Sequence, residues 1–194
     1  FGEYNGMNER GAFGLLDANI VKRDNETGTW YKFTTTNLGL SDRDIRWEQE
    51  RQGNWGYWVD YSELTRYNPF TIQTRLGGIG TTTQTINGLG AAQNVQLEME
   101  RKRFTLDLNK FLPAGYDFEV RYTHEDKTGD RMYGQGTFTT WRFLAEPINW
   151  TTQQVDATLR YTGEDLQLSG GYYGAWFENS NPALNITNSI APLS

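Results

Sequence analysis

Hydrophobic and polar residues alternate along most of this 194-residue chain. In residues 116–125 the even positions are aromatic or aliphatic as far as Tyr122, whereas the odd positions are polar or charged. The same two-residue period returns in residues 154–162 and 166–176. Because successive side chains of a β-strand point to opposite sides, this period predicts strands with one apolar and one polar face. A helical period is hardly seen.

Five further strands are predicted on the same grounds, which makes about eight in total. They cover approximately residues 11–22, 29–37, 43–51, 55–64 and 95–109. In the last of these, the apolar positions change from odd to even along the strand. A bulge near Arg101, Lys102 and Arg103 would explain that change of phase.

The lengths of the connections predict how these strands are arranged. Short turns follow the first, third, fifth and seventh strands, while long segments cover about residues 65–94 and 127–149. In an up-and-down meander, the long segments all fall on one rim. Compact soluble domains seldom carry such long connections, whereas outer-membrane barrels combine short periplasmic turns with long external loops. We therefore predict an all-β, antiparallel transmembrane β-barrel, with residues 1–194 as part of one domain and these two segments as surface loops.

The composition agrees with a barrel. The chain holds 7 Trp, 11 Tyr and 10 Phe, yet its mean hydropathy is only −0.71. Half of each barrel strand faces a polar interior, and amphipathic rings are typical of the two membrane interfaces. Candidates for such an aromatic girdle, all near predicted strand ends, are Trp55, Tyr57, Tyr61, Tyr116, Trp150, Tyr161, Tyr172 and Trp176.

Charged residues on the polar side of the predicted strands would face the lumen. These candidates are Arg46, Glu48, Glu50, Glu119, Arg121, Glu125, Asp156 and Arg160. Their mixed signs suit a wall that contacts an enclosed protein, and they suit a water-filled porin equally well. A soluble β-sandwich that binds carbohydrate through its aromatic residues would show the same alternation.

The residue inventory excludes several kinds of chemistry. With no cysteine, the chain cannot form a disulfide, a thiolate metal site or a covalent haem attachment of its own. A net charge of −6 without a basic block argues against nucleic acid as a partner. His124 is the single histidine, and we interpret it as an interfacial residue. We predict no catalytic, cofactor-binding or metal-binding residue. The N-terminus lacks a secretory signal, so we expect that one was removed or that a longer chain precedes Phe1.

Several segments, in order and at matching spacing, resemble the MtrB/PioB family of decahaem-associated outer-membrane barrels. None is a strong motif alone, but together they extend over nearly the whole chain. They are YNGM at 4–7, VKRD at 21–24, TGTW at 27–30, NLGL at 37–40, WGYWVDYS at 55–62, RYNPFTI at 66–72, GIGT at 78–81, EPINWTT at 146–152 and LQLSGGYY at 166–173.

The resemblance implies a location in the bacterial outer membrane, among its lipids, and a structural role rather than an enzymatic one. It implies a large barrel that sheathes a periplasmic multihaem c-type cytochrome, whose haem c is carried by that partner. Electrons would cross the membrane to extracellular acceptors, or in the opposite direction, with a second, extracellular multihaem cytochrome as a further partner. Since the chain is far shorter than a family member, we interpret it as the N-terminal portion, an arc of the barrel. The alternatives are a general porin or solute channel, or a secreted carbohydrate-binding β-sandwich.

Overall fold

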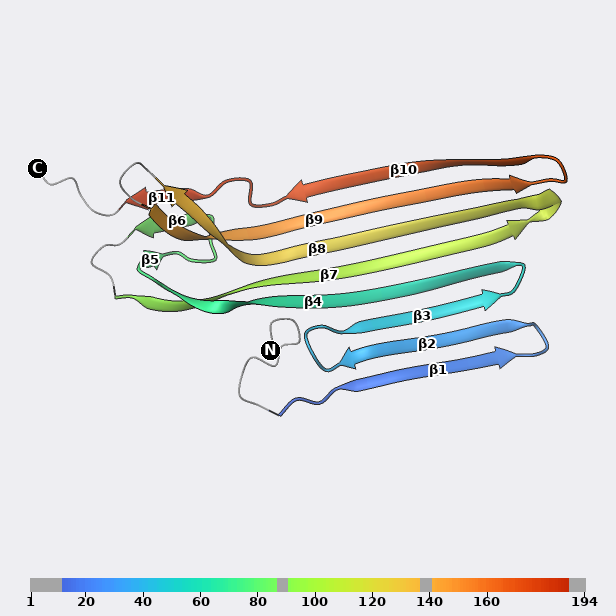
Figure 1. Ribbon diagram of the computed structural model, residues 1–194, viewed down its shortest axis with the longest axis horizontal. Helices are drawn as coiled ribbons and strands as arrows, with labels where there is room; N and C mark the ends of the chain where they lie inside the picture. The colour runs from blue at the N-terminus through green and yellow to red at the C-terminus, as the bar shows by residue number, and fades with distance from the viewer. Residues whose placement is uncertain (1–11, 87–90, 137–140, 189–194) are drawn as a thin grey trace, which may run out of the picture.

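The computed structural model describes residues 12–86, 91–136 and 141–188. It confirms the all-β, antiparallel prediction: eight strands form one sheet in the order β1-β2-β3-β4-β7-β8-β9-β10 (Figure 1). The strands of this sheet are β1 (Leu16–Asp24), β2 (Thr29–Leu38), β3 (Asp44–Arg51), β4 (Trp55–Thr74), β7 (Gln93–Leu112), β8 (Tyr116–Gly136), β9 (Trp141–Thr162) and β10 (Gln167–Asn179).

Four short turns gather at one end of the sheet. The short turns β1–β2, β3–β4, β7–β8 and β9–β10 lie at one end of Figure 1, which we call the turn end. The β7–β8 turn is a single 3-10 turn, Pro113–Gly115, in which Gly115 has a φ of 82°. A side chain there would collide with the carbonyl oxygen of Thr162, so the turn requires glycine. The opposite end, which holds the long segment between β4 and β7, is called the loop end.

The strands β4, β7, β8 and β9 reach much further toward the loop end than their hydrophobic alternation indicates. They contain 20, 20, 21 and 22 residues. Much of the segment expected as a surface loop at 127–149 is a continuing hairpin, with pairs from Lys127↔Trp150 to Gly136↔Trp141. The segment at 65–94 likewise begins as strand. Its residues 87–90, and residues 137–140 of the other segment, lie outside the described residues. Strand pairing persists here because backbone hydrogen bonds need no alternation of side chains.

A second, three-stranded sheet lies at the loop end, in the order β11-β6-β5. Its strands are β5 (Leu76–Gly77), β6 (Thr83–Ile86) and β11 (Asn185–Asn188). It contacts the large sheet directly, since the Gln84 side-chain amide donates to the carbonyl oxygen of Ala145. The most buried apolar side chains of the described residues gather in this region, among them Leu97, Leu144 and Ile148. A β-sandwich would need a second sheet along the whole length of the first, and this small sheet covers one end.

The predicted bulge at residues 101–103 is absent. Strand β7 pairs with β8 without a register shift, and its pairing with β4 shifts only between Tyr67 and Thr71 of β4. The apolar positions change from odd to even because the apolar residues of β7 lie on one face of the sheet at the loop end and on the other face nearer the turn end. Leu97 lies at the loop end on one side of the sheet, where it is buried, whereas Leu106 lies on the other side nearer the turn end.

Both edges of the eight-stranded sheet are open, because β1 and β10 each pair with one neighbour. Large apolar side chains of these edge strands are exposed, including Ile20 on β1 and Tyr172 and Trp176 on β10. Among the described residues, no helix is long and apolar enough to cross a membrane.

Candidate functional site

The strand register divides the side chains of the large sheet between two faces. One cross-strand row contains Arg46, Asp60, Thr105, Thr123 and Gln154, and we call its side of the sheet the polar face. The adjacent row points to the opposite side, which we call the apolar face. That row contains Trp47, Val59, Leu106, Tyr122 and Val155. The alternation in the sequence therefore becomes two chemically distinct surfaces.

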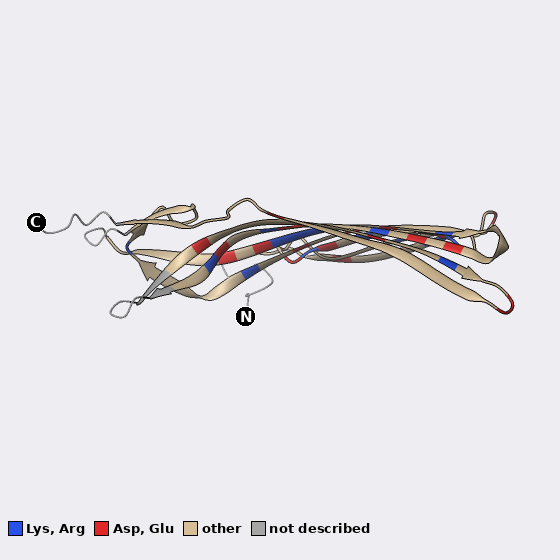
Figure 2. Cartoon of the chain, turned by 90° about the horizontal axis from the view of Figure 1, so that it is seen from above, with Lys and Arg blue, Asp and Glu red and all other residues tan. Residues whose placement is uncertain are grey.

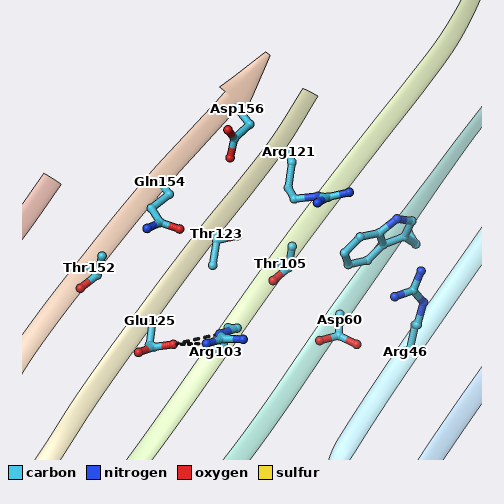
Figure 3. A pocket seen from close by; sticks show the side chains of 11 residues that line it. Arg46, Asp60, Arg103, Thr105, Arg121, Thr123, Glu125, Thr152, Gln154 and Asp156 are labelled. Atoms are coloured by element: carbon cyan, nitrogen blue, oxygen red, sulfur yellow. Dashed lines mark hydrogen bonds and ion pairs between the residues drawn. The ribbon is translucent and has the colours of Figure 1, made fainter. Parts of the chain in front are cut away.

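All eight charged residues predicted to face a lumen lie on the polar face. Their positions follow from the registers of β3, β8 and β9: Arg46, Glu48, Glu50, Glu119, Arg121, Glu125, Asp156 and Arg160. Several of them line a hollow of about 570 Å³ on this face. Figure 3 shows its side chains projecting from neighbouring strands, with Arg46, Asp60, Arg103, Glu125 and Gln154 contributed by five different strands.

Ion pairs link the strands across the polar face. Arg121 Nε lies 2.9 Å from Asp107 Oδ2, and Arg160 reaches both Glu119 at 2.9 Å and Asp117 at 3.2 Å. Further pairs join Lys32 to Glu48 at 2.8 Å and Arg103 to Glu125 at 2.6 Å. The arginine side chains are nearly half exposed, so each pair contributes at most about 1 kcal/mol to stability. The charges mainly make this surface wettable and able to pair with another charged surface.

Aromatic side chains also lie on the polar face, and alternation alone did not identify them. The Trp58 ring is flanked by two guanidinium groups, Arg46 at 3.9 Å and Arg121 at 5.5 Å from its centroid. Phe111, at the turn end, lies on the same face and is 47% exposed. The sequence signal for such a residue is a tryptophan at a position where the alternation predicts a polar side chain, as at Trp58.

Trp150 differs from the expectation that placed it in an aromatic girdle. It lies on the polar face, in edge-to-face contact with Phe177 at 5.9 Å between ring centroids. Lys127 and Arg131 lie 5.1 and 5.6 Å from its ring. Nearness to a predicted strand end suggested an interfacial role. Strand β9 instead continues well past Trp150, and its even position puts the ring on the charged side.

The other seven predicted girdle residues share the apolar face: Trp55, Tyr57, Tyr61, Tyr116, Tyr161, Tyr172 and Trp176. At the turn end, Tyr116 and Tyr161 form one row, with 4.9 Å between their ring centroids. Nearer the loop end, Tyr61 and Phe104 form another. We call the surface between these two rows the apolar belt. Within it, Arg51 and Lys110 share the Trp55 row close to the turn end, and beyond it toward the loop end the same face becomes charged.

The height of the apolar belt is comparable to a bilayer core. Along β9 it extends from Tyr161 to Gln153, eight residues, or about 27 Å at the usual rise of a strand. With a tilt of about 40° this gives a height of about 20 Å, against about 25 Å for the apolar band of outer-membrane barrels. At the next row toward the loop end, Glu63, Lys102 and Asp126 occupy the apolar face. Charged side chains therefore mark its outer boundary.

A family model described as "Putative outer membrane beta-barrel porin, MtrB/PioB" matches residues 1–193. The chain belongs to the MtrB/PioB family. It is similar to Outer membrane protein MtrB of Shewanella baltica (strain OS185), with 24% identity over 193 residues. That match covers 92% of this chain and 28% of the Shewanella protein, so the chain spans about a quarter of the length of its relative. Membership confirms the predicted family and the outer-membrane location.

The described part of this MtrB/PioB chain shows no arrangement suited to metal binding. No group of three or more His, Cys, Asp or Glu side chains is placed there to hold an ion. His124 lies at the loop-end row of the apolar belt, and its Nε2 is 3.1 Å from Asp126 Oδ2. What the two faces can do is bind: one presents hydrocarbon and aromatic rings, the other charges and guanidinium-flanked aromatic rings.

Proposed function

We propose that this chain forms an arc of a large outer-membrane barrel whose lumen holds a multihaem c-type cytochrome. The apolar belt contacts lipid, and the polar face contacts the enclosed cytochrome. The chain itself is structural and carries out no catalysis. Its family, its eight-stranded sheet and the height of its belt support the barrel, and the composition of the polar face supports a protein inside it.

A barrel larger than eight strands is needed for this role. A closed eight-stranded barrel has an interior just wide enough for side chains to fill. Here the sheet is open at β1 and β10, and the chain covers 28% of its Shewanella relative. Further strands that pair with both edges would enlarge the circumference and cover the exposed edge residues.

The aromatic residues of the polar face are the observation that carries the proposal. Trp58, Phe111 and Trp150 would each present a large apolar ring to water in an open channel. Burial of such rings against a partner is favourable by about 25 cal/mol per Å² of apolar surface. Interface cores are enriched in aromatic residues and arginine, the combination found around Trp58.

The mechanism that we propose is positional. Haem groups bound by the partner supply the redox chemistry and carry electrons across the outer membrane to or from extracellular acceptors, or a second, extracellular multihaem cytochrome. The residues of this chain hold the partner at a fixed depth, separate it from lipid and exclude water beside it. Exclusion of water lowers the local dielectric, which is one of the factors that set haem potentials.

The test uses the full-length barrel protein, purified in detergent from cells that also make its partner. We expect haem absorbance to co-purify in a fixed ratio to the barrel. The double variant Trp58→Ala, Trp150→Ala should weaken retention at least about tenfold, as expected when interface anchors are truncated. Trp55→Ala, on the apolar face, is the matched control and should keep the haem ratio.

The second candidate function is a porin, which the family description itself names. Wild-type protein that carries no haem and conducts ions alone in a planar bilayer would establish that alternative. Equal haem retention by the double variant and the control would show that the polar-face rings do not bind the partner.

A further inference from the structure

The charges on the polar face are unevenly distributed along the strands. Figure 2 shows the charged residues as coloured bands along the sheet. The four long strands β4, β7, β8 and β9 show the distribution best, because they reach the loop end. Between the turn end and the Asp60 row, their described polar-face side chains include five acids and two bases. They are Asp60, Asp107, Asp117, Glu119 and Asp156, with Arg121 and Arg160.

Nearer the loop end the balance is reversed, with five bases and two acids among the described side chains of the same strands. We call the bases the basic collar: Arg66, Arg101, Arg103, Lys127 and Arg131. The acids are Glu125 and Glu146. The sign of the surface charge therefore changes near mid-height of the sheet.

Around Glu125, the ion pairs of the basic collar leave an excess of positive charge. Glu125 is shared by two arginines, with Arg103 at 2.6 Å and Arg101 at 3.3 Å. Lys127 is directed to a ring rather than a carboxylate, with Nζ 5.1 Å from Trp150. In the collar, one carboxylate thus stands among three cationic groups within two adjacent rows.

From this distribution we propose that the enclosed protein is held in one orientation by charge, with an acidic surface at the basic collar. Its basic surface then lies against the acidic part of the wall, toward the turn end. In an outer-membrane barrel the long loops are extracellular, so the acidic end of the occupant faces outward. This inference rests on the proposed function, and it adds the polarity of the partner.

The chemistry of the collar suits carboxylates. Guanidinium groups bind carboxylates through two parallel hydrogen bonds, and the ammonium of Lys127 supplies up to three further donors. Aspartate, glutamate and the propionates of an exposed haem edge all present this group. In the reversed orientation, acids would face acids near the turn end, and such like-charge contacts oppose binding. Charge complementarity at an interface determines the orientation of the partner more than it determines the affinity.

The test again uses the full-length complex. We expect Arg101→Glu combined with Lys127→Glu to release the cytochrome at a salt concentration at which the wild type retains it, with affinity lowered about tenfold or more. Lys102→Glu is the matched control. Lys102 pairs with Asp126, next to the Arg101–Lys127 pair, but its side chain lies on the apolar face, so this charge reversal should leave retention unchanged. Because reversal could impair assembly, Lys127→Gln provides a milder variant with a smaller change in the same direction.

A second measurement reads the orientation directly. Residues 1–194 hold no cysteine, so Lys127→Cys or Thr158→Cys introduces one attachment point for a photo-crosslinker in this part of the wall, and cross-links that the unsubstituted full-length protein also gives are subtracted. Cross-links from position 127 should map to an acidic surface of the cytochrome, and those from position 158 to a basic one. Reversed or indistinguishable maps, or equal retention by the charge-reversed variant, would overturn the inference while leaving the sheath intact. Absence of haem from the wild-type barrel would instead refute the proposed function.

Discussion

The cost of an arginine substitution on strand β9 should depend on which face of the sheet the residue occupies and on its depth in the membrane. Ala157 lies in the middle row of the apolar belt, two rows from Tyr161 and two rows from Gln153. An arginine at mid-membrane on a lipid-facing strand costs about 2–4 kcal/mol, and the cost falls to about 0–1 kcal/mol near the interfaces. Four residues correspond to about 13 Å of strand, or about 10 Å of height at a tilt of about 40°.

The expected profile therefore peaks at Ala157→Arg, with lower costs at Leu159→Arg and the lowest at Tyr161→Arg. Thr158→Arg is the control at almost the same depth on the polar face, and it should cost less than about 1 kcal/mol. Arg160→Leu removes two exposed ion pairs and should likewise be tolerated. Urea titration of the full-length protein folded into phospholipid vesicles gives the free energy of unfolding of each variant.

Three results would refute the assignment of faces or of depth. The first is a cost at Thr158→Arg as large as that at Ala157→Arg, which would show that both faces contact lipid or that neither does. The second is a profile that rises steadily toward one end of β9, which would place the membrane elsewhere on the strand. A barrel that assembles equally well with Leu159→Arg and Arg160→Leu would contradict the same reasoning.

Two further predictions concern backbone conformation and pH. Gly129 has a φ of 131°, and an added Cβ would collide with the carbonyl oxygen of Glu98. Gly129→Ala should therefore lower the free energy of unfolding of the barrel by roughly 1–3 kcal/mol, measured by urea titration. Gly134→Ala is the control and should leave it unchanged, because a Cβ added there meets no atom. In the β1–β2 turn, the Thr27 hydroxyl donates to Asp24 at 2.7 Å and lowers the pKa of that carboxyl. This stabilisation is present above the unfolded-state pKa and is lost as pH falls through the folded one, so Asp24→Asn should weaken the turn at pH 6 more than at pH 3, as hydrogen exchange of its amides would reveal.

The sequence predicted the sheet well where one face meets an apolar environment. A strand beside lipid must keep its apolar residues on one side, and that requirement makes positions such as Val120 and Arg121 interpretable without a structure. The order of the strands and the placement of the short turns followed from the same pattern.

Prediction failed at the loop end, where that requirement no longer applies. Beyond the apolar belt, Leu97 and Ile148 turn to the face that is polar elsewhere, because the small sheet covers that region. Trp150 was misplaced for a different reason: it was taken to lie at a strand end, whereas β9 continues through it and its even position puts the ring on the same face as Gln154. Local alternation reports a change of phase, but only the strand register shows whether a bulge or a change of environment causes it.

The length of the β8–β9 hairpin beyond the belt has a consequence for how such a wall can change. About ten residues of β8 follow Asp126, which corresponds to about 33 Å of paired strand standing above the charged row. Insertion of two residues into each strand would raise this rim and keep every side chain on its face. Insertion of one would invert all the side chains above it. The rim can therefore grow or shrink stepwise, in units of residue pairs, without disturbing the surface beneath it.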